Sequence, residues 1–118
     1  MSDRAREIVE ALHRFRFSAT NEQELQRALW QVFARYPDSR REVILDARNR
    51  IDFLVGEVGI EVKVDGSLTD LVRQLIRYAK FEQITSIVVV STRARHRDVP
   101  RHVGGKPVHL AYLADGAL

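Results

Sequence analysis

The chain reads RIDFLV at residues 50–55 and GIEVKV at residues 59–64, and these two stretches decide the expected fold. Both are rich in β-branched residues and alternate with a period of two, which is typical of β-strands. The alternation places Ile51, Phe53 and Val55 on one face and Asp52 on the other. Gly56-Glu57 fits a two-residue type II′ turn, because glycine readily supplies the positive φ that this turn needs at its first central residue.

In this hairpin Asp52 falls opposite Glu61, and Lys63 shares the face of Glu61. Two carboxylates directly opposite each other repel and cost stability. A divalent cation bound by the carboxylate oxygens would neutralise them, and Lys63 would add a further positive charge. The alternative is an ordinary solvated, salt-bridged strand face. Helices on both sides of the sheet would favour the functional interpretation, because a covered face should not carry three charges without a reason.

The remaining hydrophobic patterns predict an α/β (α+β) protein with a mixed central sheet flanked by helices, in the order α-α-β-β-β-α-β-β. Helices are expected over residues 3–15, from residue 21 to about 36 and from residue 67 to about 80. Thr20 with Gln23, or Asn21 with Glu24, would cap the second helix. Further strands are expected at 42–46, at 86–91 as a central strand, and at 107–113. Residues 93–105 read as a polar, basic loop, and residues 1–118 as a single domain.

The composition limits the classes of function. The chain has 118 residues, no cysteine and a net charge of +3, which excludes a disulfide framework and is compatible with a polyanionic partner. No apolar run is long enough to cross a bilayer, and the start of the chain reads as a charged helix. We therefore expect no membrane partner and a cytoplasmic location, in a bacterium or a phage-infected cell. A zinc hydrolase is not expected, because no HExxH motif is present.

Asp52 followed by Glu61-x-Lys63 resembles the catalytic core of the PD-(D/E)xK nuclease superfamily. The next helix carries Gln74 and Tyr78, similar to the Gln-x-x-x-Tyr motif of the RecB-like nucleases. Upstream, Glu22 opens an amphipathic helix, as does the acidic residue on the first core helix of Holliday-junction resolvases. The resemblance covers residues 20–92 and implies the restriction-endonuclease-like fold, although Ile51 stands where the family signature has a proline.

The resemblance implies a role for each of these residues. Asp52, Glu61, Glu22 and the Val62 backbone carbonyl would bind Mg²⁺, for which Mn²⁺ can substitute. Lys63 would orient or help deprotonate the attacking water and offset charge on the phosphorane. For Glu22 the alternative is a favourable interaction with the helix dipole.

Gln74 and Tyr78 lie on one helix ridge, where they would hold Lys63 or a DNA phosphate. The alternative is an ordinary helix flank, with Tyr78 packed at its edge.

Two basic segments are candidate nucleic-acid contacts. Both flank the proposed site, so contact with a phosphate backbone is favoured over a merely solvated surface. The candidate residues are Arg48, Arg50, Arg93, Arg95, His96 and Arg97.

These features together predict a Mg²⁺-dependent DNA endonuclease that leaves 5′-phosphate and 3′-hydroxyl ends. The small domain favours a homodimer, and its size suggests a phage-type or branched-junction nuclease. The alternatives are a catalytically inactive DNA-binding or interaction domain with the same fold, and an RNA-directed nuclease or a subunit of a nuclease–helicase complex.

Overall fold

The hairpin predicted around Gly56-Glu57 is present in a computed structural model, which describes residues 3–17 and 21–113. Gly56 has a φ of 61°, and the turn joins β2 (Arg50–Val55) to β3 (Val58–Lys63). The antiparallel register pairs Val55 with Val58 and Phe53 with Ile60. The predicted two-residue turn and its register are therefore confirmed.

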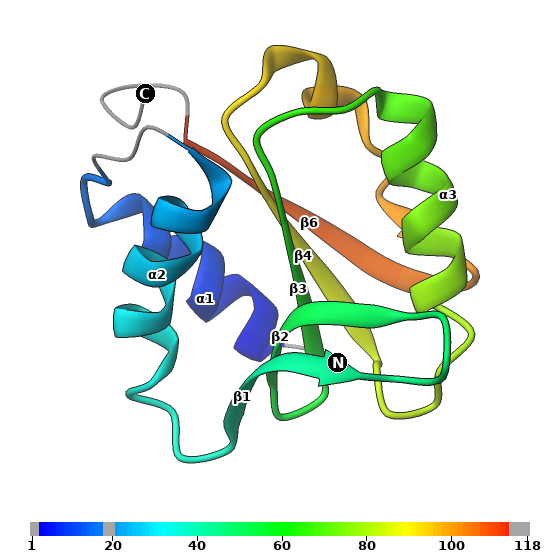
Figure 1. The fold of residues 1–118 in the computed structure, drawn as a ribbon, viewed down its shortest axis with the longest axis horizontal. Coiled ribbons are helices and arrows are strands. Elements are labelled where there is room, and N and C mark those ends of the chain that lie inside the picture. The colour runs from blue at the N-terminus through cyan, green and yellow to red at the C-terminus, as the bar shows by residue number, and fades with distance from the viewer. Residues whose placement is uncertain (1–2, 18–20, 114–118) are drawn as a thin grey trace.

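Six strands form one mixed sheet in the order β1-β2-β3-β4-β6-β5. The other strands are β1 (Ser39–Ile44), β4 (Ser86–Ser91), β5 (His102–Val103) and β6 (Lys106–Tyr112). The three central strands β3, β4 and β6 run parallel, whereas β1, β2 and β5 pair antiparallel with their neighbours. The predicted mixed sheet of an α+β protein is confirmed (Figure 1).

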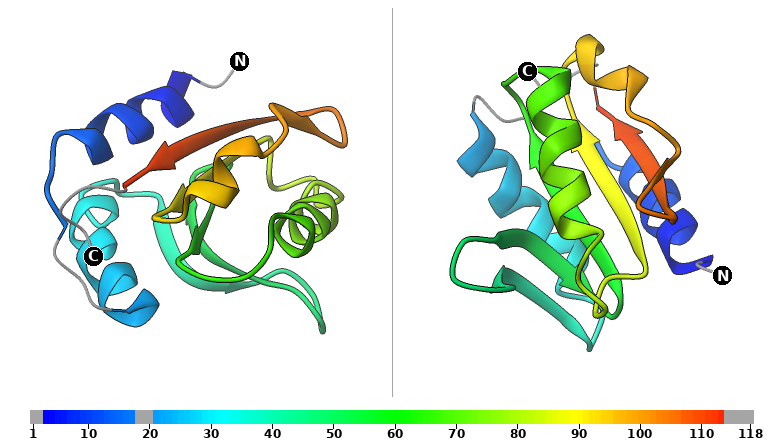
Figure 2. Two further views of the ribbon diagram at one scale, coloured as in Figure 1. Left: turned by 90° about the horizontal axis from the view of Figure 1, so that it is seen from above. Right: turned by 90° about the vertical axis from the view of Figure 1, so that its right-hand side faces the viewer.

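Three helices cover the sheet: α1 (Asp3–His13), α2 (Glu22–Phe33) and α3 (Leu68–Tyr78). The Asn21 side chain caps α2 by accepting from the Glu24 N–H at 2.9 Å. The Ser67 hydroxyl likewise caps α3. The other cap considered, at Thr20, lies outside the described residues. Figure 2 shows α1 and α2 on one face of the twisted sheet and α3 on the other.

Each face of the sheet buries its own apolar cluster. On the α1 and α2 face, Leu12, Leu29 and Phe33 pack with Phe53 and other strand residues. On the α3 face, helix and strand residues pack together, among them Leu71, Leu75, Leu54, Ile87 and Val89. A sheet covered on both faces explains why β4 is fully buried along its length.

Several local predictions were wrong. The segment expected as a loop contains a short 3-10 helix, η1 (Ala94–Asp98), and strand β5. The first strand begins at Ser39 rather than residue 42, and α1 ends at His13, which leaves Phe15 38% exposed. On α3, the apolar side chain of Ile76 is 45% exposed. Among the described residues, none of the helices has the length and apolar character to cross a membrane.

Candidate active site

Strand β2 changes direction at Asp52, beside β3. Phe53 and Val55 pack on the α1 and α2 face, but Ile51 joins Leu54 in the opposite cluster. The prediction that Ile51 shares a face with Phe53 was therefore wrong, because the period of two is broken at Asp52. On β1, Glu42 lies opposite Asp52 in the register and has a φ of 51°, which is uncommon for a residue with a Cβ.

The side chain of Asp52 fills the gap where β2 leaves β3. Its Oδ2 accepts the Val62 N–H at 2.8 Å, and its own backbone N–H lies 3.5 Å from Glu61 Oε1. The pairing of the two strands ends just before this point, at Phe53 and Ile60. Because the N–H and C=O of one strand residue point to the same side, the Val62 carbonyl also faces this gap.

Glu61 is buried, with 3% of its surface exposed, and it contacts two further side chains. Lys63 Nζ lies 3.8 Å from Glu61 Oε2 and is partly exposed. The Tyr78 hydroxyl lies 3.1 Å from Glu61 Oε1 and 2.9 Å from the Arg50 carbonyl oxygen, so its single hydrogen is donated to one of them at a time. Gln74 Nε2 donates to the same hydroxyl at 2.9 Å.

The predicted Gln74–Tyr78 pair thus lies at the site, but its contacts differ from those expected. Among the described residues, neither side chain is hydrogen-bonded to Lys63, and Tyr78 is too deeply buried to reach a DNA phosphate. Tyr78 instead positions Glu61.

Burial and mutual repulsion make both carboxyl groups harder to ionise. Burial, and then the charge of Asp52, raise the pKa of Glu61 to about 8. Burial, and then the charge of Glu22, raise the pKa of Asp52 to about 6, although the hydrogen bond from Val62 N–H opposes this. Burial and the Glu61 carboxylate also raise the pKa of Tyr78, so it is a neutral phenol at physiological pH. The nearby ammonium of Lys63 does not fully compensate the two acids.

Glu22 reaches this region from the first turn of α2. Its Oε1 accepts the Val64 N–H at 3.3 Å, and its Oε2 accepts from Gln26 at 3.4 Å. It therefore lies at the end of β3 and raises the pKa of Asp52 through its charge. Among the described residues, however, no three His, Cys, Asp or Glu side chains are placed to hold one metal ion.

The donor set at the gap fits a Mg²⁺ ion held by two carboxylates. The carboxyl groups of Asp52 and Glu61 share a side-chain hydrogen bond, and Glu61 Oε2 lies 3.8 Å from the Lys63 ammonium. Together with the Val62 carbonyl, these are hard oxygen donors, and Mg²⁺ is commonly held by one or two carboxylates while it keeps several waters. Two buried acids with raised pKa values are the electrostatic setting that a divalent cation relieves.

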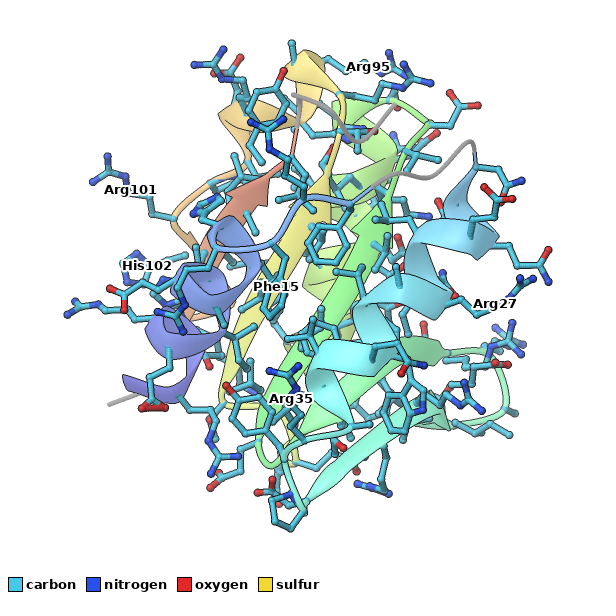
Figure 3. The ribbon with its side chains drawn as sticks, turned by 90° about the vertical axis from the view of Figure 1, so that its left-hand side faces the viewer. Phe15, Arg27, Arg35, Arg95, Arg101 and His102 are labelled. Atoms are coloured by element: carbon cyan, nitrogen blue, oxygen red, sulfur yellow. The ribbon has the colours of Figure 1, made fainter. Side chains whose placement is uncertain are left out.

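A cavity of about 190 Å³ opens beside Asp52 between α2 and strands β1 and β2. Arg27 and Arg41 line it, and Figure 3 shows Arg27 extending outward from α2. The Arg41 guanidinium also stacks on Trp30, 5.1 Å from the ring centre. The sequence analysis missed both arginines. The strand register pairs Arg41 with Phe53, next to Asp52, and this pairing becomes visible only in the structure.

The basic segment after β4 binds the turn that follows β3. Arg93 donates to the Val64 carbonyl, and Arg95 donates to the Gly66 carbonyl at 2.7 Å and to Asp65 at 3.1 Å. His96 is fully buried, with Nδ1 2.6 Å from the Ser91 hydroxyl and Nε2 2.9 Å from the Gly66 carbonyl. The prediction that His96 contacts DNA was wrong, because this ring has no exposed surface.

The other predicted phosphate contacts lie in two places. Arg48 and Arg50 are exposed next to the Asp52 gap, where Arg50 lies 3.8 Å from the carboxylate of Glu42. Arg97 lies elsewhere, over the ring of Tyr112 at the β6 edge of the sheet.

Comparisons of the chain with protein-family models, with curated proteins and with solved structures found no match.

Proposed function

We propose that this protein is a Mg²⁺-dependent endonuclease that hydrolyses phosphodiester bonds in DNA. The observation that carries the proposal is the group formed by Asp52, Glu61 and Lys63 at the gap between β2 and β3. Two carboxylates and an ammonium meet there, with Glu61 buried and Asp52 and Lys63 only partly exposed. A purely structural strand face would place such groups in solvent.

The residues of the chain have distinct tasks in this proposal. Asp52, Glu61 and the Val62 carbonyl hold the ion, and Tyr78 fixes the orientation of Glu61. Lys63 lies next to Glu61 and is partly exposed, so it can hold a positive charge at the reacting phosphate. When bound, Mg²⁺ supplies charge neutralisation and activates water as a nucleophile.

The surface around the gap favours an anionic substrate. Arg27 and Arg41 line the cavity beside Asp52, and Arg48 and Arg50 are exposed around the start of the strand that carries Asp52. We propose that these side chains bind the phosphates on either side of the scissile bond. One protomer offers a short surface, so we also propose a homodimer as the form that cuts both strands.

A second candidate is a nucleic-acid-binding domain without catalysis. It is favoured by one observation, namely that the carboxylates of Glu22 and Asp52 each accept a backbone N–H and thus have a structural use. Both candidates place DNA at the same surface, so they differ only in whether a bond is broken.

The test is incubation with supercoiled plasmid, linear duplex, single-stranded DNA, a four-way junction and RNA of matched sequence. Each is tested with Mg²⁺, Mn²⁺, Ca²⁺ or EDTA. We expect cleavage of DNA with Mg²⁺ or Mn²⁺ and none in EDTA, with little turnover in Ca²⁺. Binding without cleavage on every DNA would select the second candidate, and cleavage of RNA alone would replace DNA as the substrate.

A further inference from the structure

A second and larger cavity lies toward the opposite edge of the sheet from the proposed nuclease site. Its volume is about 680 Å³, and it extends along β6 between α1 and the segment that contains η1 and β5. None of its lining residues belongs to the group around Asp52 and Glu61. Figure 3 shows Arg101 and His102 next to α1, on the opposite side of the view from Arg27.

Basic side chains from four separate parts of the chain converge on this cavity. One basic residue comes from α1 and one from η1, and the others come from the segment before β6 and from β6 itself. They are Arg6, Arg97, Arg101, His102 and His109. Glu10 is the single acidic residue in the lining, and none of the three arginines has an ion-pair partner among the residues that the structure describes. The cavity is therefore a concentrated region of positive charge.

The rest of the lining is apolar, with Val9, Val99, Val108 and Leu110 among its members. If the arginines and histidines served only to make this surface positively charged, the cavity would not need apolar residues in its lining. A cavity of several hundred Å³ with apolar walls and a few converging charged groups is typical of a small-molecule site. Arginine is well suited to phosphate, because its planar guanidinium can donate two parallel hydrogen bonds.

His109 reports on the electrostatic field inside this cavity. Burial lowers its pKa first, and the positive charges of Arg6 and His102 lower it further. Glu10, Arg97 and Arg101 are the other charged groups that line the same space. A bound anion would oppose the effect of Arg6 and His102, so it would raise the pKa of His109.

We propose that the cavity between α1 and β6 binds a nucleoside phosphate, with the arginines on the phosphate groups and the apolar walls against the nucleoside. This site is independent of the proposed cleavage reaction, since it shares no residue with the Asp52 gap. It needs no divalent metal.

The test is an NMR titration of the full-length protein in EDTA, with adenosine 5′-diphosphate, inorganic phosphate and adenosine as separate probes. We expect adenosine 5′-diphosphate to shift the His102 and His109 ring signals and to raise the pKa of His109. Inorganic phosphate should bind more weakly at the same residues, and adenosine should bind weakest. A trinucleotide with a 5′-phosphate, compared with its 5′-hydroxyl form, distinguishes a free nucleotide from a strand end as the source.

Two variants and a matched control complete the test. Arg6→Gln and Arg101→Gln remove exposed guanidiniums of the lining, and each should weaken adenosine 5′-diphosphate binding by about tenfold. Arg40→Gln, on β1 at the far edge of the sheet, should change nothing. Unchanged amide spectra would show that each variant is folded. The proposal fails if the three variants bind alike, if adenosine binds as well as its diphosphate, or if the diphosphate shifts only signals around Arg27.

Discussion

Replacing Glu61 with Gln should stabilise the metal-free protein at alkaline pH. The carboxyl group of Glu61 has a pKa raised from the usual 4.5 to about 8 in the folded protein. Between these two values the folded state binds more protons than the unfolded state, so stability falls as pH rises. The favourable contribution is complete below pH 4.5 and is lost once pH has passed about 8. Glutamine keeps the acceptor oxygen for Tyr78 and carries no charge.

The size of this effect follows from the pKa values. At about 1.4 kcal/mol per pH unit, moving the pKa from 4.5 to about 8 corresponds to on the order of 5 kcal/mol. Relaxation and water entry lower this figure, so we expect Glu61→Gln to be more stable than the wild type by about 2–5 kcal/mol at pH 9. At pH 4 the difference should be within about 0.5 kcal/mol.

The assay is urea unfolding in EDTA at pH 4, 7 and 9, with Glu57→Gln as the matched control. Glu57 is exposed in the turn of the same hairpin, so its variant should follow the wild type at every pH. Millimolar Mg²⁺ should stabilise the wild type at pH 9 and have little effect on Glu61→Gln. A variant that is less stable than the wild type at pH 9 would refute the reasoning, because Glu61 would then be a favourable structural charge.

Three further changes test neighbouring contacts. Tyr78→Phe should cost about 1–3 kcal/mol in unfolding experiments, because it leaves the buried Arg50 carbonyl or Glu61 without its donor; no loss would show that the hydroxyl is dispensable. Lys63→Arg and Lys63→Ala should both lose nearly all cleavage while still binding DNA, since the planar guanidinium cannot replace a compact ammonium beside Glu61. Wild-type cleavage by Lys63→Ala would show that the match to the Glu-x-Lys motif is coincidental. Arg95→Ala should weaken binding to DNA and flatten its salt dependence, and an unchanged salt series would limit Arg95 to its contact with Gly66.

Local chemistry was sufficient to predict the hairpin. The glycine at the turn and the alternation of apolar residues fix the register through Phe53 and Ile60, and this register brings Asp52 next to Glu61. The apolar run at 87–90 likewise predicted a central strand, since a strand covered on both faces needs no polar alternation.

Contacts between distant segments could not be predicted in the same way. Ile51 switches faces because β2 leaves β3 at Asp52, and a period of two contains no signal for such a departure. His96 sits in a run of arginines that reads as exposed, yet its ring binds the Gly66 carbonyl 30 residues earlier in the chain. Tyr78 was predicted near the site, but the depth at which α3 packs determines that its hydroxyl contacts Glu61 and not Lys63.

The most direct test of the proposed metal-dependent nuclease is single-turnover cleavage of supercoiled plasmid by the wild type and by Asp52→Asn. Both proteins are taken from parallel preparations with matched unfolding curves, and each is assayed in Mg²⁺ and in EDTA. Asparagine keeps an oxygen that can accept the Val62 N–H, and it removes the charge and replaces the second carboxylate oxygen by an amino group. We expect the wild type to cut with Mg²⁺ alone and Asp52→Asn to be inactive under both conditions. Equal cleavage by the two proteins, or undiminished cleavage in EDTA, would contradict the account.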